Sequence, residues 1–345
     1  QKLRDFRAQF GPENVGLMTG DLSVNRAASI IVMTTEIFRN MLYAEFDDRD
    51  DPLADVEVVV LDECHYMNDS QRGTVWEESI IHCPQSVQLV ALSATVANAG
   101  QLTDWIQRVH GPTKLVISDF RPVPLHFKFC SAKGLHPLLN DEGTGIHPNC
   151  KIWRAPKGYK RKGRSSKPPQ PESPAISFVV SQMAERKMLP AIYFIFSRRG
   201  CDKAVKELLG TCLVNNEEQK LIKTRLEIYI KENKEGVRDG FHLEALSRGI
   251  ASHHAGVLPA WKELIEQLFQ EGLIKVVFAT ETLAAGINMP ARSTVISSLA
   301  KRTESGHRPL FGSEFLQMAG RAGRRGLDTE GYVITVQSRF EGVKE

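Results

Sequence analysis

The sequence predicts an α/β fold in two domains, each a parallel sheet flanked by helices. Apolar, strand-like runs alternate with helix-like stretches, and this alternation resumes after an irregular middle segment. A chain of 345 residues is long enough for two such domains. We expect a first domain at 1–125, a linker with a basic, Pro-rich insertion at 126–175 and a second domain at 176–345.

The clearest strand of the first domain lies within residues 56–67, VEVVVLDECHYM. Its Val and Leu residues scarcely alternate with polar ones, which predicts a strand buried on both faces of a parallel sheet. Asp62 and Glu63 follow at its carboxyl end, where open α/β sheets bind ligands. One carboxylate there could hold Mg²⁺ and the next could orient a water, a layout that suits nucleoside triphosphate hydrolysis.

Further elements complete the first domain. Strands are expected at 29–34 and 88–92, and the first of them leads into a helix. Asn98 is placed to cap a later helix, with Gln101 as its capping-box partner. Apolar residues at helical spacing give that helix one buried face, and Gly111 ends it.

The middle of the chain carries the excess of positive charge. The net charge is +3, yet residues 151–167 alone hold eight Lys or Arg and no acid. This run and the prolines after it are typical of a solvated surface loop, and a flexible basic arm that touches phosphates fits equally well. No apolar run approaches the roughly 20 residues of a membrane helix. The six cysteines show no CxxC spacing, which favours a reducing compartment and indicates no zinc site.

The second domain opens with an expected strand at 191–196, and a helix begins near Gly200. A helix at 258–269 has Pro259 in its first turn, and a strand follows at 274–280.

The segment QMAGRAGRRG at 317–326 is the most distinctive of this domain. Its three glycines leave the backbone uncluttered, and its three arginines supply fork-shaped donors that suit phosphate oxygens. The functional interpretation is an arginine finger that reaches across a cleft between the domains, an effect worth roughly 10³–10⁵ in rate. A basic loop that binds nucleic acid is the alternative.

Five segments together resemble superfamily-two DExH-box helicases of the Ski-type branch. They are LDECHYM, ALSAT, SHHAGVLP, ATETLAAGINMPAR and QMAGRAGRRG, in this order. Two others, GTVWEESIIHCP and LPAIYFIFSRRGCDKAV, look most like the plant plastid and cyanobacterial members. The resemblance implies two tandem RecA-like domains and the use of ATP and Mg²⁺.

The resemblance implies a role for each matching residue of the first domain. Asp62 would hold Mg²⁺ through water, Glu63 would polarise the attacking water, and His65 would link the ATP site to the other domain. Ser93 and Thr95 would couple hydrolysis to strand separation.

Matching residues of the second domain would act on the nucleotide. Gln317 would sense it, and Arg321 and Arg324 would contact its phosphates, with Arg324 as the finger. Gly286 and Asn288 fall where the family contacts the sugar or its surroundings. Related helicases often have Asp at the position of Asn288.

Contact with nucleic acid is implied for residues at strand ends and helix starts. Hydroxyls and helix N-termini can hold backbone phosphates there without reading bases. Taken singly, each also fits a helix cap. The residues are Thr34, Thr35, Glu36, Ser197, Arg198, His254, Gly256, Thr280 and Thr282. Sequence-neutral binding of a single strand is the implied mode.

A β-hairpin is expected at residues 301–308. Two extended stretches between the last two motifs flank a plausible turn at Ser305-Gly306. Ski-type helicases place a duplex-opening hairpin at the matching position, and an ordinary surface hairpin is the alternative.

A phosphate-binding loop of the form GxxxxGK[ST] should precede the DECH segment and is absent from the sequence. Near matches at 11–18 and 158–165 lack the Lys, and the second also lacks a preceding strand. We therefore expect an N-terminally truncated piece of a longer motor, which by itself binds ATP weakly and hydrolyses little.

The resemblance implies an ATP-dependent RNA helicase core that translocates 3′ to 5′ and unwinds duplexes, without a membrane segment. Alternatives are a DNA repair helicase of the same branch and a non-catalytic RNA-binding scaffold. The expected location is the chloroplast stroma or a cyanobacterial cytoplasm.

Overall fold

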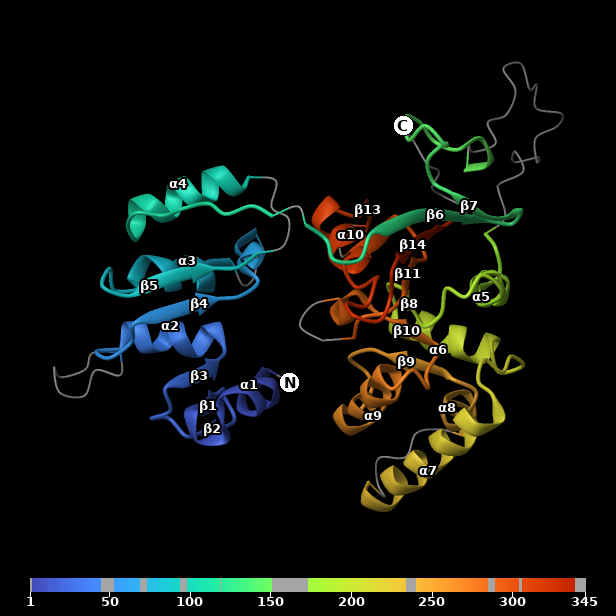
Figure 1. Cartoon of the computed structure of the whole chain (residues 1–345), viewed down its shortest axis with the longest axis horizontal. Helices are drawn as coiled ribbons and strands as arrows, with labels where there is room; N and C mark the ends of the chain where they lie inside the picture. The colour runs from blue at the N-terminus through green and yellow to red at the C-terminus, as the bar shows by residue number, and fades with distance from the viewer. Residues whose placement is uncertain are drawn as a thin grey trace. The chain divides into compact units, whose positions relative to one another are not determined.

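The computed structural model divides into two compact units, Gln1–Asp119 and Phe120–Glu345 (Figure 1). The first unit ends before the boundary that the sequence predicts near residue 125. The residues described are 2–338, with gaps at 45–52, 69–72, 94–97, 119, 151–172, 234–239, 285–288 and 304–305. No helix within these ranges is long and apolar enough to cross a membrane.

Pairs of parallel strands form the framework of the first unit. β1 pairs with β3 in parallel and with β2 in antiparallel, while β4 and β5 form a separate parallel pair. The strands are β1 (Val15–Met18), β2 (Ser23–Val24), β3 (Ile30–Met33), β4 (Val58–Leu61) and β5 (Gln88–Ala91). The helices are α1 (Lys2–Phe10), α2 (Thr35–Tyr43), α3 (Gly73–His82) and α4 (Ala99–Val109), with 3-10 turns η1 (Pro12–Asn14) and η2 (Cys64–Asn68). The three strands predicted for this domain are confirmed.

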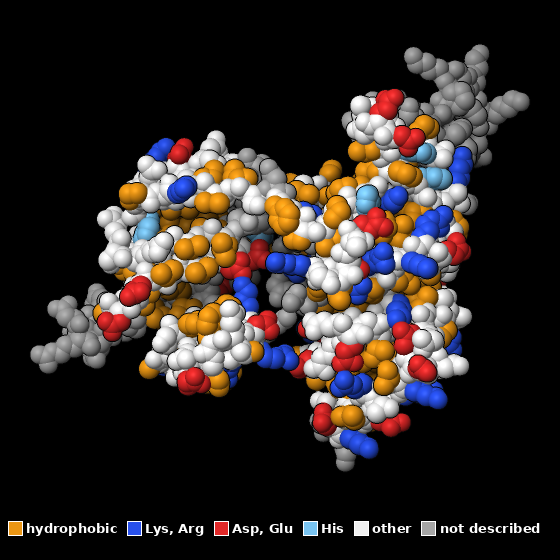
Figure 2. Space-filling view, in the orientation of Figure 1, with side chains coloured by type: hydrophobic (Ala, Val, Ile, Leu, Met, Phe, Trp, Pro, Cys, Tyr) orange, Lys and Arg blue, Asp and Glu red, His pale blue; other side chains and the backbone are white. Residues whose placement is uncertain are grey.

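Only one face of β4 is covered by the described part of the first unit. Val59 and Leu61 pack with side chains of α2 and α3 in one hydrophobic cluster. Val58 and Val60 are 48% and 56% exposed, and Figure 2 shows hydrophobic side chains gathered on this face of the unit. Because successive side chains of a strand point to opposite faces, this cluster can bury only every second residue. The prediction of a strand buried on both faces is therefore wrong for this structure.

Helix α4 begins after Asn98 as predicted, but the predicted capping box is absent. The Asn98 side chain makes no capping hydrogen bond. Its backbone, at φ −111° and ψ 32°, departs from the extended conformation that N-cap residues usually adopt. The predicted end of the helix is confirmed, because Gly111 follows the C-cap residue with a φ of 147°.

A seven-stranded sheet forms the centre of the second unit (Figure 1). The order is β7-β6-β14-β11-β8-β10-β9, and all neighbours are parallel except β6 and β7. The strands are β6 (Leu125–Ser131), β7 (Gly134–Pro137), β8 (Ala191–Phe194), β9 (Ile250–His253), β10 (Val276–Ala279), β11 (Ser293–Ile296) and β14 (Gly331–Val336). The strands predicted within 191–196 and 274–280 are confirmed.

Side chains of this sheet are buried on both faces. Along β8, Ile192 and Phe194 belong to one hydrophobic cluster, and Ala191 and Tyr193 belong to the other. The helices are α5 (Ile176–Glu185), α6 (Arg198–Glu207), α7 (Asn216–Glu232), α8 (Gly240–Ser247), α9 (Pro259–Gln270) and α10 (Gly312–Ala319), with 3-10 turns η3 (Pro148–Cys150) and η4 (Glu281–Leu283). Parallel strands alternating with helices confirm the predicted mixed α/β class.

The segment predicted as a linker, 126–175, differs from the prediction in its first part. β6 pairs with β14 along six residues, and β7 pairs with β6. β6 reads LHFKFCS, an alternation of apolar and polar residues that is typical of a half-exposed strand and that the prediction of a linker overlooked. Only its last three residues are fully buried. The basic run at 151–167 lies outside the described residues.

The predicted hairpin is confirmed. β12 (Ala300–Thr303) pairs in antiparallel with β13 (Gly306–Pro309), and Lys301 lies opposite Arg308. Gly306 has a φ of 117°, a conformation that favours glycine. The tip residues 304–305 lie outside the described residues.

Candidate functional site

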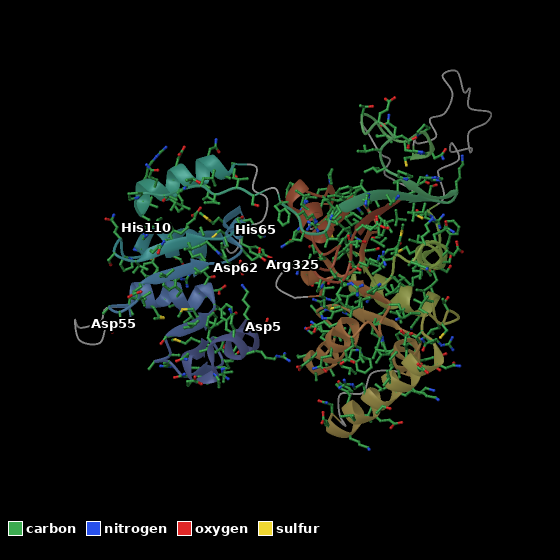
Figure 3. The ribbon with its side chains drawn as sticks, viewed as in Figure 1. Asp5, Asp55, Asp62, His65, His110 and Arg325 are labelled. Carbon is green, nitrogen blue, oxygen red and sulfur yellow. The ribbon has the colours of Figure 1, made fainter. Side chains whose placement is uncertain are left out.

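The acids of the DECH segment lie in a backbone turn directly after β4 (Figure 3). Glu63 adopts a φ of 58°, which is uncommon for a residue with a side chain. The turn is fixed because the amide of Cys64 donates to the carbonyl of Leu92, 2.9 Å away at the end of β5. It is also fixed because the amide of Glu63 donates to Oδ1 of Asp62 at 3.0 Å. Both carboxyl groups therefore lie at the carboxyl end of the β4–β5 pair, as the sequence predicts.

Both acids remain accessible. The side chains of Asp62 and Glu63 are 43% and 36% exposed, and Lys2 of α1 forms an ion pair with Asp62. Oε2 of Glu63 lies 3.3 Å from Nδ1 of His65. This contact between Glu63 and His65 does not have the geometry of a hydrogen bond. Neither ring nitrogen of His65 has a hydrogen-bond partner among the described residues. His65 instead stacks on Tyr66, with ring centroids 4.8 Å apart.

The donor chemistry at this turn fits Mg²⁺. Mg²⁺ prefers oxygen ligands and is usually held by one or two carboxylates, with waters and substrate phosphates filling its other positions. Asp62 offers an accessible carboxylate of this kind. The described residues contain no group of three or more metal-ligating side chains, so a closed all-protein metal cage is not present among them.

A hollow of about 230 Å³ lies beside His65. Glu77 of α3 and Gln101 and Trp105 of α4 contribute to its lining. The sequence pattern predicts a capping-box role for Gln101, and the shared position of Gln101 and Trp105 beside the DECH turn was missed. No signal in the sequence relates residues 77 and 101 to the DECH turn, because this proximity depends on tertiary packing. Ser93 is exposed after β5, and Thr95 lies outside the described residues.

In the second unit, the predicted phosphate-contacting residues lie on α10 and on the loop after it. Gln317 is half-buried in α10. Nε of Arg321 donates to the carbonyl of Ala284 at 2.9 Å, and the amide of Ala291 donates to the carbonyl of Arg321. The loop is therefore tied to the segment that follows β10. Gly286 and Asn288 belong to that segment but lie outside the described residues.

Arg324 is held by an acid that the sequence analysis missed. Nε and Nη2 of Arg324 donate to the two carboxylate oxygens of Asp328 at 2.8 and 2.9 Å, and its backbone amide also donates to Asp328. Burial opposes ionisation of Asp328, but these hydrogen bonds outweigh it and lower the pKa of the carboxyl. No sequence signal indicated this pair, because the i,i+4 rule applies to helices and residues 324–328 form no helix. Neighbouring Arg325 is exposed (Figure 3).

The ion pair with Asp328 does not use all the N–H donors of the Arg324 guanidinium group. A guanidinium group carries five N–H donors, and the side-chain bonds to Asp328 use Nε and Nη2. Nη1 has no hydrogen bond among the described contacts, so Asp328 can orient Arg324 while donors remain for a phosphate.

The residues predicted to contact nucleic acid fall into two groups: residues at the starts of helices, and the buried His254 with its neighbour Gly256. Thr34 and Ser197 occupy N-cap positions of α2 and α6, and Thr280 precedes η4. Ser197 accepts a hydrogen bond from the amide of Gly200 at 3.0 Å, whereas Thr34 makes no side-chain capping bond. Thr280 and Thr282 place their hydroxyl oxygens 2.9 Å apart. Thr35, Glu36 and Arg198 occupy the first turns of α2 and α6.

His254 belongs to the second group, because its ring is buried and engaged. Nε2 lies 3.1 Å from Oδ1 of Asp202, and Nδ1 accepts from the amide of Gly256 at 3.2 Å. Ser252 donates to the same carboxylate at 2.9 Å. Burial opposes ionisation of Asp202, but the hydrogen bonds from His254 and Ser252 lower its pKa. The ring therefore shapes the loop after β9, and Asp202 was missed from the sequence.

Two models of helicase families match the chain. Residues 5–102 match the family model "DEAD/DEAH box helicase", and residues 200–326 match "Helicase conserved C-terminal domain". The chain is 44% identical over its whole length to the chloroplastic DExH-box ATP-dependent RNA helicase DExH15 of Arabidopsis thaliana. Over 97% of its length it is 39% identical to the ATP-dependent RNA helicase mtr4 of Schizosaccharomyces pombe and 37% identical to the antiviral helicase SKI2 of Saccharomyces cerevisiae.

The chain spans about a third of the length of these relatives: 33%, 31% and 30%. The first family model matches the first α/β unit and the second model matches the second, so the units are two RecA-like helicase domains. The chain therefore belongs to the DEAD/DEAH box helicases, in the branch that contains the Ski2 and Mtr4 proteins.

Proposed function

We propose that this chain is the motor core of an ATP-dependent RNA helicase that translocates 3′ to 5′ and separates duplexes. The observation that carries the proposal is the pair of accessible carboxylates, Asp62 and Glu63, at the end of β4 in a unit that matches the DEAD/DEAH box model. RNA as the substrate is supported by relatives that are named RNA helicases.

The first unit supplies the residues for hydrolysis in this proposal. Bound Mg²⁺ would neutralise phosphate charge, and Asp62 would hold it through water. Glu63 would orient and polarise the attacking water, and its fixed backbone turn keeps the carboxylate in place. His65 and Ser93, with Thr95, would report the state of this site to the rest of the motor.

The second unit supplies residues for the nucleotide and for RNA. Arg324, oriented by Asp328, would stabilise negative charge on the transferring phosphate, and Arg321 and Gln317 would assist it. Gly286 and Asn288 would lie near the nucleotide sugar.

Backbone phosphates of a single strand would be held by exposed hydroxyls and helix starts, without reading of bases. The residues are Thr34, Thr35, Glu36, Ser197, Arg198, Thr280 and Thr282, with Gly256 beside them and His254 in support. The β12–β13 hairpin would open the duplex.

The proposal is tested by unwinding assays on the intact protein. Duplex RNA with a 3′ single-stranded tail should be opened at least about tenfold faster than the same duplex with a 5′ tail. Equal rates on both tails would contradict the polarity. Faster unwinding of a matched DNA duplex would favour a DNA repair helicase, and RNA binding without hydrolysis would favour a scaffold. A plastid location is supported by the chloroplastic relative and is checked by imaging a tagged protein in plant cells.

A further inference from the structure

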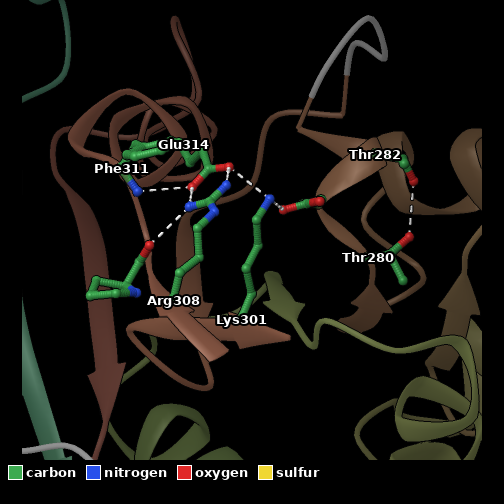
Figure 4. Close-up of polar contacts among 8 residues, drawn as sticks. Thr280, Thr282, Lys301, Arg308, Phe311 and Glu314 are labelled. Atoms are coloured by element: carbon green, nitrogen blue, oxygen red, sulfur yellow. Dashed lines mark hydrogen bonds and ion pairs between the residues drawn. The ribbon is translucent and has the colours of Figure 1, made fainter. Parts of the chain in front are cut away.

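The hairpin is attached to the rest of the second unit by a network of charged side chains at its base (Figure 4). Nζ of Lys301 lies 2.7 Å from a carboxylate oxygen of Glu281 and 2.7 Å from one of Glu314. Arg308 binds both oxygens of Glu314, at 2.9 and 2.7 Å. The amide of Phe311 donates to Glu314 at 2.8 Å. One carboxylate, that of Glu314, thus accepts from three different residues.

The network solves an electrostatic problem within the hairpin. Lys301 on β12 lies directly opposite Arg308 on β13, and like charges in that position destabilise a strand pair. Glu314 interacts with both cations and so compensates their repulsion. The guanidinium of Arg308 also lies 4.0 Å from the ring centre of Phe311, a favourable cation–π geometry.

The groups at the centre of the network are well shielded from solvent. The side chains of Lys301 and Glu314 are 13% and 22% exposed. Burial works against the charge on Glu314, yet the hydrogen bonds from Arg308 and Lys301 lower its pKa to about 2. Burial also works against the charge on Lys301, and its bonds to Glu281 and Glu314 raise its pKa. Glu314 and Lys301 are therefore both charged at neutral pH, and hydrogen bonds between charged groups are stronger than those between neutral groups.

The network joins three segments that have different proposed roles. Glu281 lies between Thr280 and Thr282, which are proposed to hold the RNA backbone. Glu314 lies in the first turn of α10, and Gln317 follows one turn later on the same helix. Lys301 and Arg308 belong to the hairpin. A movement of α10 or of η4 would therefore be transmitted to the hairpin through these side chains.

We propose that Glu314 and Lys301 are positioning residues that couple the hairpin to the nucleotide-contacting helix α10 and to the RNA-contacting turn η4. This inference rests on the proposed helicase function. The two residues touch neither ATP nor RNA in the proposal. They determine how much duplex is opened for each ATP consumed.

The test compares two activities of the intact protein. In the Glu314→Gln and Lys301→Met variants, duplex unwinding should fall about tenfold while RNA-stimulated ATP hydrolysis stays within about twofold of wild type. The matched control is Glu271→Gln, because Glu271 pairs with Arg225 at 2.9 Å on an exposed surface of the same unit. That variant should change neither activity.

Two further results separate coupling from simple stability. Lys301→Met combined with Glu281→Gln should be no worse in unwinding than Lys301→Met alone, since both changes break the same link. Without ATP or RNA, amides of residues 300–303 and 306–308 should exchange faster in Glu314→Gln than in wild type, while the amides of β8 stay unchanged.

Equal loss of unwinding and hydrolysis, or full unwinding by Glu314→Gln, would overturn the inference. Failure of the wild-type protein to unwind any duplex would instead overturn the proposed function. In that case, unchanged amide exchange of residues 300–303 and 306–308 in Glu314→Gln would show separately that the network does not hold the hairpin.

Discussion

Two strands with similar sequences, β4 and β10, lie in different surroundings. β4 reads VVVL and β10 reads VVFA, and each is a run of apolar residues. All four residues of β10 are buried, because it lies between β8 and β9 in a sheet with hydrophobic clusters on both faces. In β4, Val58 and Val60 are about half exposed. An apolar run therefore specifies a strand, but the elements packed around it determine how many of its faces are buried.

The acidic side chains of the two units also differ in how far they are enclosed by their surroundings. Asp62 and Glu63 end β4 with accessible carboxylates. In the second unit, Glu314 and Asp328 are enclosed by cationic donors that fix their geometry. The second unit thus holds its candidate functional side chains in place by ion pairs, and the first unit does so mainly through its backbone turn.

The largest expected effect separates two adjacent arginines. Arg324→Lys should slow ATP hydrolysis by the intact protein about 1,000-fold, because Lys cannot form the bidentate pair with Asp328 or present a planar fork to phosphate. Arg325→Lys is the matched control and should change the rate by less than about threefold. Steady-state phosphate release measures both. Equal effects would contradict the assignment of Arg324 as the finger.

A smaller effect compares the two strands directly. Val277→Ala in β10 removes two buried methyl groups and should lower the free energy of unfolding of the second unit by about 2 kcal/mol. Val60→Ala in β4 should lower the stability of the first unit by less than about 0.5 kcal/mol in this 345-residue chain. Urea titrations of the two variants measure the difference. Equal losses would mean that the open face of β4 is covered in solution.

The smallest expected effect depends on pH. The pKa of Glu314 is lowered from 4.5 to about 2 in the folded protein, so its ionisation stabilises the fold above pH 4.5. At pH 7, wild type should exceed Glu314→Gln in unfolding free energy by about 1 kcal/mol, allowing for solvent screening. The difference should shrink as the pH falls from about 4.5 toward 2. Urea titrations across this range measure it, and a difference that grows in acid would contradict the ion-pair network.

The sequence predicts the fold where local pattern and surroundings agree. The strands at 191–196 and 274–280, the helix that starts at Pro259 and the hairpin near Gly306 follow from apolar runs, from proline in a first helical turn and from turn residues. β6 escaped prediction although His126 and Lys128 alternate with apolar residues, as in a half-exposed strand. Its pairing with β14 spans about two hundred residues and has no local sequence signal.

The sequence predicts the candidate site residues themselves, but it does not predict the residues that hydrogen-bond to them. Asp62, Glu63 and Arg324 are placed by motif and by strand ends. Asp328 and Asp202 were missed because an acid that orients an arginine or a histidine carries no pattern of its own. The Asp202–His254 pair depends on packing between separate segments, and the Arg324–Asp328 pair depends on the conformation of one loop. Neither arrangement follows from a local sequence pattern.

We propose that Glu63 orients the attacking water for ATP hydrolysis. Single-turnover hydrolysis by the intact protein carrying Glu63→Gln tests this role, with Glu57→Gln as control, since Glu57 is an exposed acid just before β4. We predict a loss of at least about 100-fold for Glu63→Gln with ATP binding retained, and no loss for the control. A hydrolysis rate within about threefold of wild type for Glu63→Gln would contradict the claim.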